Sequence, residues 1–195
     1  MLTVAIQAGG QSARMGEDKA LKPFLGRPLI ARVIDRLQPI ADELIVTTNR
    51  PAEYAFLGLP LFADLRPGRG ALGGLYTAIA SAKSPLVAVA ACDLPFVSAR
   101  LLETAARRLV EENVDVVIPR SAAGLEPMHA VYRRETCLPV IEAAIEGGLW
   151  KVIAWFPQVK VLELAADDER AFWNINTPEE FSRAEAMVKG LNVER

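Results

Sequence analysis

Residues 8–19 read AGGQSARMGEDK and directly follow the short apolar run TVAIQ. The order predicts a buried strand, a glycine-rich turn and then cations with acids among them. Gly9 and Gly10 can adopt positive φ angles and let the backbone approach a ligand closely, and consecutive N–H groups in such a turn form a concave site for anionic oxygens. Arg14 and Lys19 add full positive charge. The stretch predicts a triphosphate-binding loop, with a plain connecting loop as the alternative.

This stretch lacks the spacing of the two commoner phosphate-binding loops. A P-loop needs GxxxxGK followed by Ser or Thr, whereas Lys19 is followed by Ala20. The dinucleotide fingerprint GxGxxG is also missing. The sequence therefore argues against a nicotinamide or flavin enzyme.

Composition sets the broad class. The chain has 195 residues, of which 51% are hydrophobic, so we expect one domain spanning residues 1–195. A net charge of −2 argues against general nucleic-acid binding. We expect no membrane span and no signal peptide, because no apolar run approaches roughly 18 residues and the start MLTVAIQAGG lacks a basic region. Cys92 and Cys137 lack CxxC spacing, and free thiols are typical of a cytoplasmic protein.

Apolar runs of the kind that buried parallel strands show alternate with helical patterns. The runs are TVAIQA, ELIVTT, LPLFA and PLVAVAAC, and the helical patterns cover residues 28–37, 71–82 and 98–112, the last with Ser98 as N-cap. This alternation predicts an α/β three-layer domain with right-handed crossovers. Further on, DVVIP and EPMHAVYR predict an antiparallel excursion. We expect a helix in TCLPVIEAAIEGG, a strand in QVKVLEL and a last helix capped by Thr177 and Glu180.

Polar side chains follow several predicted strands directly. Asn49, Asp64 and Asp93 each come just after a strand, as the glycine loop does. In open α/β sheets, ligands bind beyond the carboxyl ends of the strands, so we expect these groups to converge. Asp93 is the first candidate for a magnesium ligand, because a carboxylate at a buried strand end needs a cation or donors; the alternative is a helix or turn cap. Asp64 is either a ligand or an ordinary turn residue.

A second glycine-rich segment, RPGRGALGGL at residues 66–75, opens a helix. Gly73 and Gly74 in a first helical turn each lower helix stability by roughly 1 kcal/mol relative to Ala. We therefore expect a ligand or another backbone segment to approach closely there.

The segments AGGQSARMGEDKALKPFLGRPLI, DLRPGRGALGGL, CDLP and FWNINTPEEF, in that order, resemble the molybdenum cofactor guanylyltransferases of the MobA family. The resemblance implies a Rossmann-like nucleotidyltransferase fold with a mostly parallel sheet. It also implies transfer of GMP from GTP to the terminal phosphate of molybdenum-bound molybdopterin, with Mg²⁺ as cofactor and pyrophosphate as the second product. A molybdoenzyme or a maturation protein is expected as a further, transient partner.

The resemblance also implies roles for single residues. Ala8, Gly9, Gly10, Lys19 and Asp64 would bind the guanine nucleotide, and Asp93 would bind the nucleotide and ligate the metal. The pterin-phosphate side would be formed by Arg14, Gly74, Asn174 and Asn176. Arg14, Lys19 and Asp93 would then be the catalytic residues.

Two positions depart from the family pattern. Gln7 stands where the family usually has Leu, at a nucleotide-binding position, and is expected to change a contact with the base or ribose. Thr47 replaces an asparagine of the nucleotide site. The AGG form, rather than AAG, favours GTP over CTP. The alternatives are a related transferase that uses CTP or a sugar or polyol phosphate acceptor, and a non-catalytic nucleotide-binding maturation factor.

The mechanism implied is an in-line attack of the acceptor phosphate on the α-phosphorus, in which positioning and charge neutralisation dominate. For His129 we expect a structural or substrate-lining role. Asn174 and Asn176 are expected to alternate on a short strand, either as ligands or as support for the turn before Thr177. The tryptophans Trp150, Trp155 and Trp173 are expected in the core, with Trp150 beside the pterin as an alternative.

Overall fold

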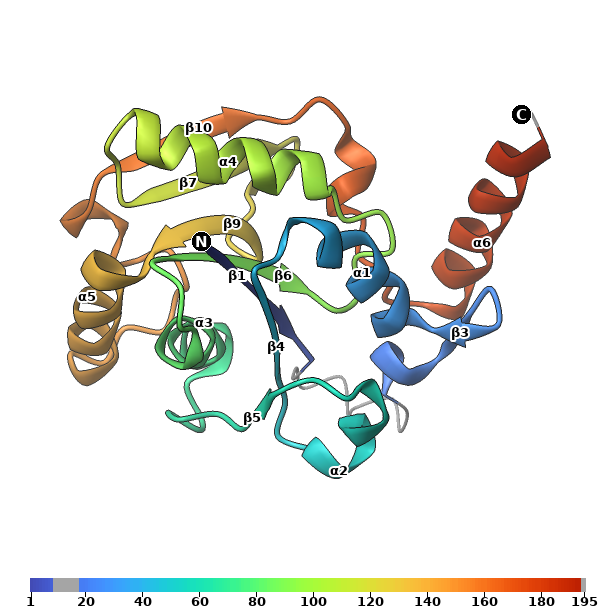
Figure 1. Ribbon diagram of the computed structural model, residues 1–195, viewed down its shortest axis with the longest axis horizontal. Helices are drawn as coiled ribbons and strands as arrows, with labels where there is room; N and C mark the ends of the chain where they lie inside the picture. Colours follow the sequence, from blue (N-terminus) through green and yellow to red (C-terminus); the bar gives the residue numbers. More distant parts are fainter. Residues whose placement is uncertain (9–17, 194–195) are drawn as a thin grey trace.

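A mostly parallel sheet forms the middle layer of the molecule in the computed structural model, which describes residues 1–8 and 18–193 (Figure 1). Neighbouring strands follow the order β10-β7-β9-β6-β1-β4-β5, with the short β8 beside β7. The strands are β1 (Leu2–Gln7), β4 (Glu43–Thr47), β5 (Leu61–Phe62), β6 (Leu86–Ala91), β7 (Val116–Ser121), β8 (Gly124–Leu125), β9 (His129–Arg133) and β10 (Val161–Ala165).

The strand directions place several loops on one edge. β1 is parallel to both β4 and β6, and β5 is parallel to β4. β9 is antiparallel to both β6 and β7, which confirms the predicted antiparallel excursion. The chain therefore leaves β1, β4, β5 and β6 at the same edge of the sheet, where ligands bind in open α/β folds.

Helices cover both faces of the sheet. In Figure 1, α1 (Leu29–Leu37) and α4 (Ala99–Glu111) lie on one side, and α3 (Gly70–Ser81) and α5 (Arg134–Glu146) on the other. Because successive strand residues point to opposite faces, Val4 and Ile6 of β1 join the core under α1 and α4, whereas Ala5 joins the core under α3 and α5. The expected α/β three-layer architecture is confirmed.

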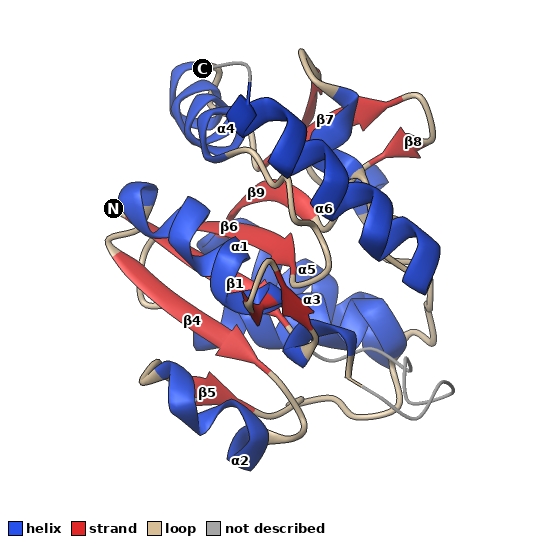
Figure 2. Ribbon diagram, turned by 90° about the vertical axis from the view of Figure 1, so that its right-hand side faces the viewer, coloured by secondary structure: helices blue, strands red, loops and turns tan. Residues whose placement is uncertain are grey.

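The last helix, α6 (Pro178–Val193), lies apart from these layers beside the hairpin β2 (Pro23–Phe24) and β3 (Arg27–Pro28) (Figures 1 and 2). A separate small core holds it there, formed by Phe24, Leu29, Ile175 and Ala184. The expected capping box is present, since Glu180 N–H donates to Thr177 Oγ1 (3.2 Å) and Thr177 N–H donates to Glu180 Oε2 (3.0 Å). The remaining helical turns are η2 (Lys19–Leu21), η3 (Gln38–Ile40), α2 (Pro51–Tyr54), η4 (Ala55–Leu57), η5 (Phe156–Gln158) and η6 (Glu169–Phe172).

Most predicted elements occur within two or three residues of their expected ends. Ser98 caps α4 as expected, accepting a hydrogen bond from Leu101 N–H (3.2 Å). The short strand expected around Asn174 and Asn176 was wrong: residues 173–176 form no strand, because a single backbone bond, from Ile175 N–H to Asp93 O (3.1 Å), replaces a ladder. None of the helices in the described residues combines the length and the apolar character of a membrane span.

Candidate active site

The carboxyl ends of β1 and β6 lie side by side. Gln7 is opposite Ala91, and Cys92 N–H donates to Gln7 O (3.1 Å). On the other side of β1, Ala8 N–H donates to Thr47 O (2.8 Å). The start of the glycine-rich segment and the CDLP segment therefore leave the sheet at neighbouring positions. Gly9, Gly10 and Arg14 lie outside the described residues.

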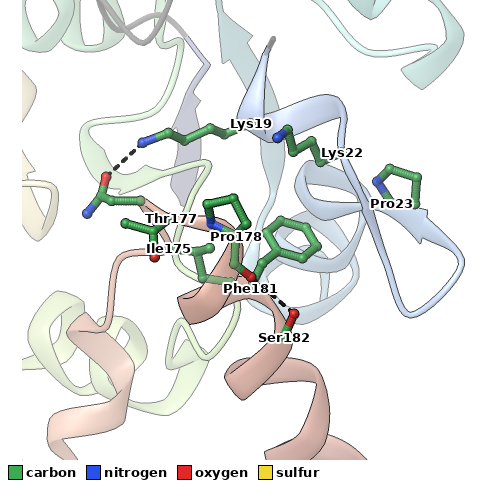
Figure 3. Close-up of a pocket in the computed structure, with 9 residues that line it drawn as sticks. Lys19, Lys22, Pro23, Ile175, Thr177, Pro178, Phe181 and Ser182 are labelled. Carbon is green, nitrogen blue, oxygen red and sulfur yellow. Dashed lines mark hydrogen bonds between the residues drawn. The ribbon is translucent and has the colours of Figure 1, made fainter. Parts of the chain in front are cut away.

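Lys19 brings positive charge to this edge from the turn η2. Its Nζ donates to Asn176 Oδ1 (3.0 Å), a bond drawn in Figure 3, and so joins the first segment of the chain to the segment before α6. A cavity of about 300 Å³ opens beside this contact. It combines two lysines, the first turn of α6 and apolar walls, and is lined by Lys19, Lys22, Pro23, Ile175, Asn176, Thr177, Pro178, Phe181 and Ser182.

Asp93 lies at the end of β6 in an environment that disfavours its charge. Burial raises the pKa of its carboxyl above the usual value, and a backbone hydrogen bond and the nearby positive charge of Lys19 only partly offset that rise. Its main-chain oxygen accepts the bond from Ile175 N–H that fixes the segment carrying Asn174 and Asn176. Lys19, Asp93 and Asn176 are thus brought together at one edge of the sheet. Asn174 is exposed beside them.

The residues at this edge fit a magnesium ion that is completed by phosphate oxygens. Among residues 1–8 and 18–193, no group of three His, Cys, Asp or Glu side chains forms a complete protein cage for a metal. Magnesium is commonly held by only one or two carboxylates together with substrate phosphates. A partly buried carboxylate with raised pKa, which a substrate phosphate can approach, fits such a partial site.

Asn49 and Asp64 form a reciprocal pair at the ends of β4 and β5. Asn49 Nδ2 donates to Asp64 Oδ2, and Asp64 N–H donates to Asn49 Oδ1, both at 2.9 Å. The pair orients the Asp64 carboxylate and leaves it partly exposed. Asp64 therefore belongs to an ordered turn at the edge where β4 and β5 end, and its role as a ligand stays a prediction.

The glycines of α3 are explained by close approach of the protein itself. A Cβ atom at Gly73 would lie 2.7 Å from the main-chain oxygen of Arg66, and one at Gly74 would lie 2.9 Å from Gln7 Oε1. Gly74 therefore lets the end of β1 pack against the first turn of α3. Gln7 Nε2 is buried there without a hydrogen-bond partner among the described residues.

His129, Trp155 and Trp173 pack against other side chains, whereas Trp150 lies at the surface. His129 is 1% exposed, its ring packs on Phe172 at 5.2 Å, and burial lowers its pKa to about 4, which favours the structural role. Trp155 is buried and Trp173 stacks on Phe96, as core residues do. The core expectation for Trp150 was wrong: it follows the end of α5, is 62% exposed and lies under the Arg69 guanidinium.

The sequence did not single out Asp18, Arg50 or Tyr54. Asp18 directly precedes Lys19, and its carboxylate accepts hydrogen bonds from Arg50 and from the Tyr54 hydroxyl. The only sequence signal for this cluster was the acidic residue before the lysine in GEDK. Arg50 and Tyr54 lie more than 30 positions from Asp18, and such distant contacts leave no local sequence pattern.

Comparison with known proteins gives a consistent result. The family model described as "MobA-like NTP transferase domain" matches residues 4–161. The chain is 35% identical to a molybdenum cofactor guanylyltransferase of Desulfosudis oleivorans, covering 96% of each chain. It is also 35% identical to one of Burkholderia ambifaria, covering 90% of this chain and 91% of the relative. A crystal structure of molybdopterin-guanine dinucleotide biosynthesis protein A from Archaeoglobus fulgidus superposes with a TM-score of 0.81 at 26% identity, covering 96% of this chain and 99% of that one.

Proposed function

Since the chain belongs to the family of MobA-like NTP transferases, we propose that it transfers GMP from GTP to the terminal phosphate of molybdenum-bound molybdopterin. The products are the guanine dinucleotide form of the cofactor and pyrophosphate. The pairing of β1 with β6 carries this proposal, because it places Ala8 and Asp93 at one edge, with Lys19 close enough to affect the Asp93 carboxyl. The names and near full-length similarity of the relatives support the choice of substrates.

In the proposed reaction the protein positions the substrates and neutralises their charge, and it takes little part in covalent chemistry. Asp93 would hold the metal, and a bound magnesium ion would neutralise charge on the phosphate oxygens. Lys19 would exchange its hydrogen bond with Asn176 for one with a phosphate oxygen, and the Asn176 amide N–H groups would then bind a second oxygen. A phosphate monoester has its second pKa at about 6 and is largely ionised at neutral pH, so no general base is required.

The nucleotide side of the site would extend along the strand ends. Ala8, Gly9 and Gly10 would contact the nucleotide, and Asp64, oriented by Asn49, would offer it an acceptor group. Gln7 is bonded to the protein through its main chain and touches Gly74, so its side chain would reach the ligand only by leaving that contact. Arg14 and Asn174 would complete the acceptor phosphate side.

Pyrophosphate release tests the proposal. The purified protein is incubated with GTP, Mg²⁺ and molybdenum-loaded molybdopterin, and CTP replaces GTP in a parallel reaction. We expect release that requires the pterin and GTP, with little release from CTP. Equal release from CTP would instead favour a related transferase, and nucleotide binding without any release would favour a non-catalytic maturation factor.

Nucleotide binding is measured separately by protection against thermal unfolding. A ligand at 100 times its dissociation constant stabilises the native state by about 2.7 kcal/mol. We expect Mg-GTP to raise the melting temperature more than Mg-CTP at equal concentration. This comparison separates a loss of binding from a loss of turnover.

A further inference from the structure

Asp18, the residue before Lys19, uses both carboxylate oxygens within the protein. Its Oδ1 accepts a hydrogen bond from Ala20 N–H (3.1 Å), which caps the turn η2. Its Oδ2 accepts the Tyr54 hydroxyl (2.6 Å) and the Arg50 guanidinium. The side chain is 12% exposed. Because its oxygens are already occupied, this carboxylate is poorly suited to serve as a metal ligand or a base.

The donors come from α2, which follows β4. Tyr54 is fully buried, and burial together with the hydrogen bond to Asp18 raises the pKa of its hydroxyl. The hydroxyl therefore keeps its proton and remains a donor at neutral pH. Arg50 reaches Asp18 from the protein surface and also pairs with Glu53 at 3.2 Å. One rigid buried donor and one charged donor thus converge on a single oxygen.

Asp18 in turn fixes the backbone from which Lys19 extends. Its main-chain oxygen accepts Leu21 N–H (3.1 Å), and Lys22 N–H donates to Lys19 O (3.2 Å), so the turn is closed on both sides. Ala20, the residue between Lys19 and Leu21, is fully buried. A lysine has a long and flexible side chain, so the direction in which it enters the cavity depends on how firmly its backbone is held.

From these contacts we propose that Asp18, held by Tyr54 and Arg50, is a positioning residue that fixes Lys19 for binding the triphosphate. The inference rests on the proposed function, because it takes Lys19 as a phosphate ligand. It assigns no contact with substrate to Asp18 itself. Arg50 also directly follows Asn49, the partner of Asp64, so one short loop after β4 orients both the lysine and the Asp64 carboxylate.

A double-mutant cycle tests whether Asp18 acts through Lys19. The variants are Asp18→Asn, Lys19→Met and the double variant, and the readouts are kcat and KM for GTP and the Kd of Mg-GTP. In the parent, Asp18→Asn is expected to weaken kcat/KM by about 10- to 100-fold, the scale of misplacing a catalytic group. In the Lys19→Met background the same change is expected to cost less than about twofold. Equal losses in both backgrounds would overturn the proposal.

A milder pair of variants covers the case in which Asp18→Asn fails to fold. Tyr54→Phe removes only the hydroxyl, and Tyr76→Phe is its matched control, because the Tyr76 hydroxyl donates to Glu142 Oε1 (3.0 Å), which also binds Arg66. Tyr54→Phe is expected to weaken Mg-GTP binding several-fold, and Tyr76→Phe to leave it unchanged. Equal effects of the two changes would contradict a specific role for Tyr54 and Asp18.

The proposed function and the positioning role of Asp18 can fail independently of each other. If the parent binds GTP but releases no pyrophosphate, the proposed function is wrong, and the Kd of Mg-GTP still reports whether Asp18 and Lys19 are coupled. If the parent turns over and the cycle is additive in both kcat/KM and Kd, the function stands and the positioning role of Asp18 is wrong.

Discussion

The carboxyl group of Asp93 is largely removed from water and lies near the positive charge of Lys19. It follows the end of a buried strand, where burial raises its pKa, and a backbone hydrogen bond and the positive charge of Lys19 only partly offset this effect. Because the offset is incomplete, the ionised carboxylate still destabilises the folded chain, and a bound metal ion would remove that cost. A perturbed pKa of this kind makes Asp93 a candidate functional residue.

The first prediction concerns the pH dependence of stability. Because the pKa of Asp93 is higher in the folded than in the unfolded chain, the folded state binds this proton more tightly. Its contribution to stability is therefore full below the unfolded pKa and is lost as pH rises through the folded pKa. Without metal, the Asp93→Asn variant should be at least as stable as the parent at pH 7, and the difference should shrink in acid.

Urea unfolding at several pH values measures this effect. Asp168→Asn is the contrasting control, because hydrogen bonds from Arg170 lower the pKa of Asp168, and its contribution is lost as pH falls. A metal-free Asp93→Asn variant that is less stable than the parent at pH 7 would show that the carboxylate is satisfied by the protein alone.

The second prediction separates the two adjacent glycines of α3. Gly73→Ala would press a methyl group against the main-chain oxygen of Arg66, which cannot move without its loop, and should cost about 1–3 kcal/mol. Gly74→Ala meets only the end of the Gln7 side chain, and a gain of up to about 1 kcal/mol in helix propensity offsets that contact. Denaturant unfolding should rank Gly73→Ala well below Gly74→Ala; equal stabilities would refute the packing described here.

At the scale of elements, the segment before α6 carries Asn176 and is tied to the start of that helix. The capping box fixes it: Glu180 Oε2 accepts both Asn176 N–H (2.6 Å) and Thr177 N–H (3.0 Å). The small core beneath α6 is separate from the two cores of the sheet. Local opening of α6 is therefore expected to need less free energy than global unfolding.

The third prediction follows from this separation. Thr177→Ala removes one half of the capping box and should cost about 1 kcal/mol of local stability. Amide hydrogen exchange should accelerate in α6 but not in β1 or β6, and KM for the acceptor should rise because Asn176 is less firmly placed. Faster exchange throughout the sheet would instead show that α6 unfolds together with the main domain.

The sequence predicted the sheet strands and the long helices, because each has an apolar run or stripe of its own. It missed β2, β3 and β8, which have only two residues each and no room for an alternating pattern. At the site, Asp93 and Lys19 follow clear strand or glycine signals. The bonds from Asn49 to Asp64 and from Tyr54 to Asp18 join separate segments, and only the fold brings those side chains together.

At the scale of the whole molecule, residues from both ends of the chain meet at one edge of the sheet. Parallel pairing of β1 with β6 brings Ala8 and Asp93 to the same edge of the sheet, and the bond from Lys19 to Asn176 spans 157 positions. The similarity to the relative from Desulfosudis oleivorans extends over 96% of the chain. The proposed transferase therefore depends on a site assembled by the entire fold rather than by one motif.

Magnesium-dependent pyrophosphate release by the Asp93→Asn variant tests this proposal most directly. The exposed Asp167 supplies the matched control, Asp167→Asn, which removes the same charge elsewhere on the surface. Loss of a group that organises charge in the transition state typically lowers kcat by about 100-fold or more. We expect such a loss for Asp93→Asn with an unchanged fold, and parental rates for Asp167→Asn; parental magnesium-dependent turnover in the Asp93→Asn variant would contradict the proposed site.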